Sequence, residues 1–175
     1  SIAIGTGAKA LTEAFNIAIG ETAISSGNQS LAIGRESDAT TAAAIAIGNF
    51  SQATTGAYTL ALGSRGFALT SHGAIALGSG GTAGAESSGI GSIAIGAGDA
   101  SSAIGAKSTT NGSIAIGGND GTNAAANAGT GANAVAIGAG AIANAADAWQ
   151  FGVGTNSTAN SAQFSGLDLS VDGKL

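Results

Sequence analysis

Few residues of this chain could take part in chemistry, and those few do not form a catalytic or metal-binding pattern. The 175 residues include one histidine, His72, and no cysteine. Nucleophilic catalysis needs a serine or cysteine with a histidine and a third, orienting group, and no such set can be assembled around His72. One histidine could ligate a metal ion only where copies of the chain meet on a symmetry axis, so we interpret His72 as a solvated turn residue. The sequence therefore predicts no catalytic, cofactor-binding or metal-binding residue and no enzymatic activity.

Two glycine motifs are superficially similar to ligand-binding loops. The pattern Gly-x-Gly-x-x-Ala occurs at Gly5–Ala10, Gly129–Ala134 and Gly138–Ala143. At Gly5 and Gly138 it is a by-product of the repeat described below, and at Gly129 it lacks the strand and helix of a dinucleotide site. The stretch Gly117–Asn123 is similar to a calcium-binding β-roll nonapeptide. One copy with so few carboxylates cannot supply the six to eight oxygens that calcium takes.

Aromatic residues are scarce, and three of them fall within two consecutive repeats. Phe50, Tyr58 and Phe67 are candidate receptor contacts, because exposed aromatic side chains dominate many binding surfaces. The alternative is local packing between neighbouring chains or repeats. We expect Trp149 and Phe151 to fill the end of the fold.

Composition excludes several classes of protein. The net charge is −5, and the five basic residues are scattered, so no nucleic-acid partner is expected. The 31 glycines come without proline or a three-residue period, which excludes collagen, and the regular aliphatic content argues against disorder. No apolar run approaches 18 residues, so this segment is not expected to insert into a membrane. No signal peptide is recognisable either, and we expect a piece of a longer protein whose export and anchoring segments lie elsewhere.

The dominant feature is a short pentad, Ser-Ile-Ala-Ile-Gly at residues 1–5, that recurs every 14–15 residues. A fixed short period predicts a solenoid, in which each repeat forms one turn. Its closing glycines are Gly5, Gly20, Gly34, Gly48, Gly63, Gly78, Gly96, Gly105, Gly117, Gly138 and Gly154. Four or five aliphatic residues bounded by glycine predict a short strand with both large side chains on one face and alanine on the other. The candidate core or trimer-packing residues are Ile2, Ile4, Ile17, Ile19, Leu31, Ile33, Ile45, Ile47, Leu60, Leu62, Ile75, Leu77, Ile93, Ile95, Ile114, Ile116, Val135 and Ile137.

A weaker pattern of small, unrestricted and small residues follows each glycine and predicts a second short strand. Its last small residues are Ala10, Ser25, Ala39, Ala53, Ala68, Ala83, Ser101, Thr110, Thr122, Ala143 and Ala159. Two repeats are longer, and we expect their extra residues to form surface loops at Gly80–Ser92 and Gly118–Asn133. The short spacings around Gly105 predict a partly skipped turn.

The first strand of each repeat is apolar on both faces, yet a two-layer turn has one interior. The other face needs a cover, and identical copies of the chain are the economical one. We therefore expect a homo-oligomeric fibre with the first strands at its axis and the second strands in solvent. Composition alone does not give the number of chains.

The pattern (Ser/Asn)-φ-Ala-φ-Gly-x-x-(Ala/Ser)-x-(Ala/Ser/Thr) resembles the head repeat of the YadA-like trimeric autotransporter adhesins. The resemblance covers residues 1–159 and implies an all-β, left-handed parallel β-roll of about eleven turns, assembled as a homotrimer. It also implies attachment to a host surface receptor, matrix protein or glycan, and a place on the bacterial surface, anchored in the outer membrane by other segments. Residues 160–175 are expected to form a closing strand or a transition to the next fibre module.

The segment Gln150-Phe-Gly-Val-Gly-Thr-Asn-Ser157 resembles instead the end of the same repeats in bacteriophage tail fibres. A tail-fibre segment that binds a receptor is thus the alternative to an adhesin head. An ice-binding solenoid would need a flat threonine ladder, which Thr40, Thr54, Thr70 and Thr82 do not build.

Overall fold

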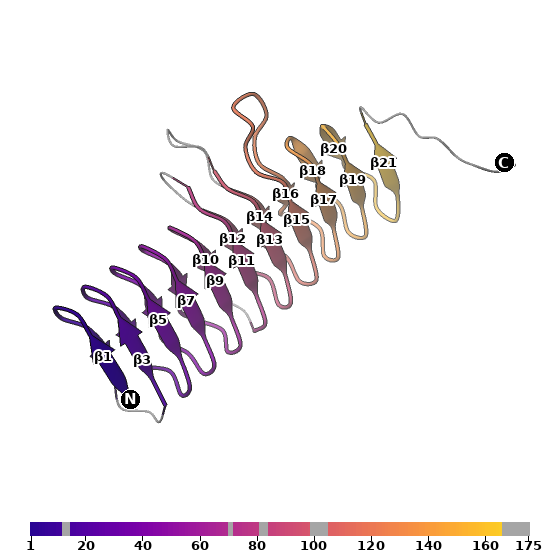
Figure 1. Cartoon of the computed structure of the whole chain (residues 1–175). Helices are drawn as coiled ribbons and strands as arrows, with labels where there is room; N and C mark the ends of the chain where they lie inside the picture. Colours follow the sequence, from indigo (N-terminus) through magenta and orange to yellow (C-terminus); the bar gives the residue numbers. More distant parts are fainter. Residues whose placement is uncertain (12–14, 70–71, 81–83, 99–104, 166–175) are drawn as a thin grey trace, which may run out of the picture.

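The chain is a parallel β-solenoid, seen in a computed structural model that describes residues 1–11, 15–69, 72–80, 84–98 and 105–165 (Figure 1). Within these residues every regular element is a strand, and the strands form two parallel sheets of eleven and ten strands. Odd-numbered strands stack in the first sheet and even-numbered strands in the second, so each turn of the chain adds one strand to each. The predicted all-β parallel solenoid is confirmed.

The first sheet contains β1 (Ile2–Ile4), β3 (Ile17–Ile19), β5 (Leu31–Ile33), β7 (Ile45–Ile47), β9 (Leu60–Leu62), β11 (Ile75–Leu77), β13 (Ile93–Ile95), β15 (Ile114–Ile116), β17 (Val135–Ile137), β19 (Trp149–Phe151) and β21 (Ala162–Phe164). The second contains β2 (Lys9–Ala10), β4 (Ile24–Ser25), β6 (Asp38–Ala39), β8 (Gln52–Ala53), β10 (Phe67–Ala68), β12 (Glu86–Ser87), β14 (Lys107–Ser108), β16 (Asn127–Ala128), β18 (Ala141–Ala143) and β20 (Gly154–Asn156). β21 pairs with β19 and lies inside the expected closing segment, of which residues 166–175 are outside the described part.

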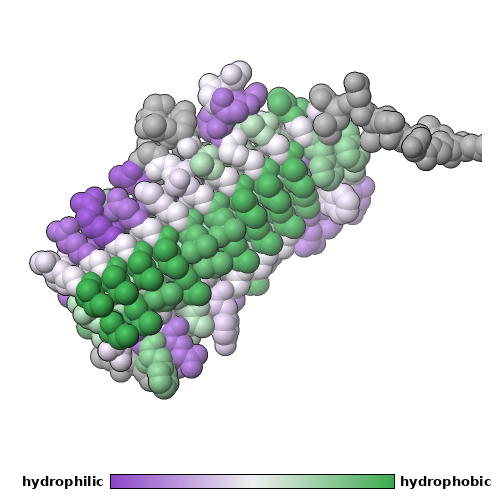
Figure 2. Space-filling view, viewed as in Figure 1, coloured by the Kyte–Doolittle hydropathy of each residue, from purple (hydrophilic) through white to green (hydrophobic). Residues whose placement is uncertain are grey.

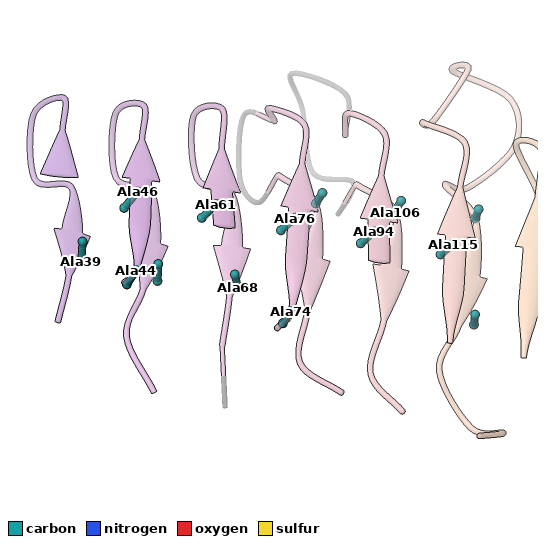
Figure 3. Packing of buried hydrophobic residues seen from close by; sticks show 14 of the residues in the cluster. Ala39, Ala44, Ala46, Ala61, Ala68, Ala74, Ala76, Ala94, Ala106 and Ala115 are labelled. Atoms are coloured by element: carbon teal, nitrogen blue, oxygen red, sulfur yellow. The ribbon is translucent and has the colours of Figure 1, made fainter. Parts of the chain in front are cut away.

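The interior between the two sheets is built mainly from alanine, which Figure 3 shows, and also contains buried serine. From β3 to β17 the central alanine of each first-sheet strand, such as Ala46 or Ala61, is fully buried, whereas the flanking aliphatic residues point outward and are only half-buried. In the terminal strand β1 all three residues are exposed. A turn of 14–15 residues encloses a space that methyl groups fill, and larger side chains must therefore leave it. The candidate core or trimer-packing residues thus lie outside the roll interior, and their packing against other chains stays a prediction.

Three pairs of serine hydroxyls bond each other in this interior. Ser87 on β12 lies 2.6 Å (Oγ to Oγ) from Ser92, and the Ser25–Ser30 pair repeats the arrangement. At the same two places in another turn stand Ala39 and the fully buried Ala44. Because an unpaired hydroxyl is costly to bury, the hydroxyls outside these pairs bond a backbone carbonyl, as Ser51 does with Gly48 and Thr59 with Gly56, each at 3.0 Å.

The glycine that closes each pentad forms the first corner of the turn. At Gly48 the backbone has φ of +137°, and an added Cβ would lie 2.4 Å from the carbonyl oxygen of Gly63 in the next turn. Both the torsion and the space exclude any other residue.

Three consecutive turns are longer, and all their extra residues lie at this first corner, between a first-sheet and a second-sheet strand. The segments are 78–85, 96–106 and 117–126. The predicted loops Gly80–Ser92 and Gly118–Asn133 were therefore too long, because β12 and β16 fall inside them. Each insertion displaces the second strand along the sequence, so Thr110 and Thr122 lie outside strands, while Ala83 and Ser101 are outside the described residues. Ala159 lies outside strands for another reason: Gly154, expected to close the last pentad, is the first residue of β20.

Among the described residues, no first-sheet strand corresponds to the repeat ending at Gly105. β13 pairs directly with β15, so no strand lies between them. Residues 102–104 of that repeat are outside the described part of the chain. The pentad pattern there belongs to the inserted segment, and the two short spacings together make one long turn.

Shortening one insertion provides a test of this boundary. Deletion of 119–124 would leave Gly118, Ala125 and Ala126 between Gly117 and β16, the three-residue corner that separates Gly48 from β8. We expect solubility, oligomeric mass and the unfolding midpoint to change little, because the deleted residues contribute no side chain to the interior. Size-exclusion chromatography and thermal unfolding measure this, and an aggregated product would show that the segment belongs to the core.

Candidate functional site

The outward side chains of the first sheet form one continuous surface, which we call the apolar face. It consists of the first and third residues of each first-sheet strand: Ile2, Ile4, Ile17, Ile19, Leu31, Ile33, Ile45, Ile47, Leu60, Leu62, Ile75, Leu77, Ile93, Ile95, Ile114, Ile116, Val135, Ile137, Trp149, Phe151, Ala162 and Phe164. They stack in register in two ladders along the rod. Figure 2 shows them as an unbroken band of apolar surface. At a strand spacing of about 4.8 Å the band is about 48 Å long.

No polar or charged residue interrupts the apolar face. Inside the band each side chain is half-buried by the equivalent residue of the next turn, and at the ends Ile4 is 57% and Trp149 is 49% exposed. Contiguous apolar surfaces of this size mark interaction sites on soluble proteins.

The outer face of the second sheet is different, because it mixes apolar with charged and polar residues. Asp38, Gln52 and Phe67 follow one another along it, and Glu86 forms an ion pair with Lys107 of the next turn (Oε2 to Nζ, 3.2 Å). Such a face is compatible with water. The outer surfaces of the two sheets thus differ, one uniformly apolar and the other mixed with polar and charged residues.

The ionised side chain of Asp38 on this face is expected to lower the stability of the fold. Partial burial, and secondarily the charge of Glu36, raise the pKa of Asp38 above its ordinary value. The folded chain therefore binds this proton more tightly than the unfolded chain, and stability falls as the pH rises from the unfolded pKa through the folded one. We expect Asp38→Asn to raise the urea midpoint at pH 7, with the gain vanishing below about pH 3.9. Equal gains at both pH values would contradict this origin.

The structure does not bring the three candidate receptor contacts together. Phe50 lies at the first corner between two guanidinium groups, 4.8 Å from Cζ of Arg35 and 5.3 Å from Cζ of Arg65 to the ring centroid. Phe67 points outward from β10, and Tyr58 lies at the opposite corner, 71% exposed. The guanidinium groups of Arg35 and Arg65 lie over the ring of Phe50 and make it less available to a receptor. Tyr58 is therefore the most accessible of the three.

A further exposed aromatic shares the corner of Tyr58. Phe15 is 76% exposed and, like Tyr58, has a positive φ, of 65° and 60° respectively. Sequence reasoning missed Phe15, which lies outside the pentad. Its place two residues before a first strand, as for Tyr58 before Leu60, was the available signal.

The remaining candidate motifs are parts of turns. His72 is exposed in the turn before β11. Among the residues that the structure describes, no three histidine or acidic side chains gather in a group that could hold a metal ion. In the same part of the chain, no helix has the length and apolar character needed to cross a membrane.

The calcium-like stretch is held by its own hydrogen bonds. Asp120 accepts from the backbone nitrogens of Thr122 and Asn123 at 2.9 and 2.6 Å, and from Asn123 Nδ2 at 3.0 Å. The bond from the Asn123 side chain, followed by these backbone bonds, lowers the pKa of Asp120. The carboxylate serves to order the loop.

The end of the roll is closed by polar residues. The prediction that Trp149 and Phe151 fill it is wrong, because both point outward and Phe151 stacks on Phe164 with ring centroids 4.8 Å apart. Gln150 between them is fully buried and donates from Nε2 to the carbonyl oxygen of Gly152 at 3.1 Å. Asn156 donates to the carbonyl oxygen of Trp149 at 2.9 Å. Gln150 and Asn156 thus hydrogen-bond backbone carbonyl groups from positions that alanine occupies in the preceding turn, where Ala136 and Ala143 are their register partners.

Comparison with known families identifies the repeat. The family described as YadA head domain repeat (2 copies) matches residues 17–37, 42–65 and 130–148. These stretches make up less than half of the chain and do not include Gln150–Ser157, so the resemblance to tail fibres stays a prediction. No curated protein matches the sequence.

Proposed function

Because the chain carries YadA-type head repeats on a parallel β-solenoid, we propose that it is a non-enzymatic head segment of a homotrimeric surface fibre that mediates attachment. The observation that carries the proposal is the apolar face, uninterrupted over the whole rod. The family supports three as the number of chains and the bacterial surface as the location.

The size of the apolar face supports burial against another chain. A band about 48 Å long and roughly 10 Å wide presents on the order of 500 Å². Two such faces in contact bury about 1,000 Å², which is the lower bound for a specific interface. A lone chain in water would leave this area exposed.

The best occupant of the face is a second copy of the same chain. The face has no charge, so it offers a charged or polar partner nothing to pair with. Its ridges repeat at the strand spacing, and another copy presents the same ridges at the same spacing. A rotation axis parallel to the rod brings identical faces together and closes the ring.

This arrangement directs the second sheet, both corners and the inserted segments outward. Attachment to a host receptor, matrix protein or glycan would use that outer surface, with Tyr58 as the most exposed of the three contacts expected from the sequence. Three copies of each weak contact on one fibre raise the effective concentration for the second and third binding events.

The mass of the particle tests the proposal. We expect mass photometry and sedimentation to give about three times the 16.2 kDa of one chain at micromolar concentration. Trp149, the only tryptophan, should shift its fluorescence emission to shorter wavelength on assembly, because its exposed side chain becomes buried. A soluble, folded particle with the mass of a single chain would overturn the proposal. An array of glycans and matrix proteins probed with the assembled fibre would identify the ligand.

A further inference from the structure

The regular part of the apolar face does not fix how far one copy lies along another. From β1 to β15 both ladders contain only isoleucine and leucine, which are isomers of equal carbon count. Two copies displaced by one turn, about 4.8 Å, would therefore keep nearly the same contacts. Chains that assemble through this face need another feature to set their axial register.

One end of the apolar face is unlike the rest. At β19 the ladders change to Trp149 and Phe151, and at β21 they continue as Ala162 and Phe164. The step from an indole ring to a methyl group leaves a hollow of about 280 Å³ beside Trp149, lined also by Asp147, Asn160, Ser161 and Ala162. The hollow thus begins at the height of the protruding ring and extends to the next turn.

The hollow has the chemistry to receive an indole. Ala162 and the chain's own Trp149 supply apolar surface, and indole has one polar group, an N–H that only donates. Acceptors are present at the rim: the Asp147 carboxylate, of which Oδ1 accepts from Asn133 Nδ2 at 3.1 Å, and the Ser161 hydroxyl.

We propose that Trp149 of each copy enters the hollow beside Trp149 of the next copy and thereby sets the axial register of the assembly. The proposal rests on the self-association of the apolar face proposed above. Rotation about an axis parallel to the rod preserves height, so in aligned chains each ring lies beside both the indole and the hollow of the next copy. A displacement by one turn places the ring at the height of Val135 or of Ala162, away from the indole of the next copy.

Disulfide trapping can read the register, because the chain has no native cysteine. Ile47→Cys and Leu77→Cys lie on the same ladder, two turns or about 10 Å apart. Since a disulfide needs Cα atoms within about 7 Å, aligned copies can form only 47–47 or 77–77 bridges, and a mixed bridge requires displacement. The two chains are refolded together, oxidised and analysed by mass spectrometry.

The trapping is repeated with Trp149→Leu, which removes the ring, and with Ala162→Phe, which fills the hollow and keeps the ring. We expect mixed bridges to rise at least tenfold in both. Val153→Ala is the matched control, because Val153 is 53% exposed at the same end of the rod but outside the apolar face, and it should leave the pattern unchanged.

The outcomes separate the two proposals. Particles of trimer mass that form only same-residue bridges with Trp149→Leu and Ala162→Phe would overturn the register proposal alone. A parental chain that remains at single-chain mass would overturn the proposed assembly and the register proposal with it.

Discussion

Replacement of Ile47 and Leu62 together by aspartate is expected to convert the proposed trimer into folded single chains. The two residues are register partners on adjacent strands and point away from the interior, so the roll itself should survive. Burying an unpaired carboxylate in an apolar interface costs several kcal/mol, and each copy would bring two. Association should weaken by at least about a thousandfold.

Sedimentation gives the mass of this variant, and circular dichroism shows that the strands persist. The matched control is Gln52→Asp with Phe67→Asp, a pair from the same two turns, in register on the outer face of the second sheet. It adds the same charge to the solvent face and should leave the trimer intact. Loss of assembly in the control, or an intact trimer in the test variant, would contradict the assignment of the two faces.

Gly48→Ala is expected to destabilise the fold strongly, as an example of the substitutions at the first corner. Its φ of +137° strains any other residue, and the added methyl group would lie 2.4 Å from the Gly63 carbonyl oxygen. A residue held at such a torsion costs up to about 3 kcal/mol, before the displacement of the neighbouring turn is added. Urea unfolding measures the loss, and a change below 1 kcal/mol would contradict the close approach of the turns.

The control for this substitution lies at the other corner. Gly91 has φ of +61°, and an added Cβ would meet no atom within 4 Å. Asn133 and Asp147 occupy the same place, two residues before a first-sheet strand, with φ of 54°. We therefore expect Gly91→Asn to be tolerated, since this torsion is one that asparagine adopts readily.

The fold could be predicted from the sequence because the pentad specifies both a short strand and the turn that follows it. Isoleucine, alanine, isoleucine and glycine give a three-residue strand and a corner, and repetition gives the parallel sheet. Which face pointed inward was not settled by alternation, since Ile47 and Ala46 are both apolar. The size of the interior decides it: a turn of this length leaves room for the alanine methyl group and not for isoleucine.

The inserted segments were located only approximately, for a physical reason. The second strand is two residues long in most turns, and small residues are common throughout the chain, so Thr122 fitted the pattern as well as Ala128 does. Pairing with the neighbouring turns fixes the true strand, and that information is not local. The polar end of the roll was also missed. The two aromatic residues that flank Gln150 were expected to fill the interior, whereas the informative signal was glutamine at the position that alanine occupies in the other pentads.

The concentration of insertions at one corner has an evolutionary consequence. Residues added there leave the rise per turn, the alanine interior and the apolar face unaltered, as the three long turns demonstrate. The inserted segments could therefore vary in length and chemistry from turn to turn during evolution, and so acquire new binding targets, while the β-solenoid that displays them stays the same.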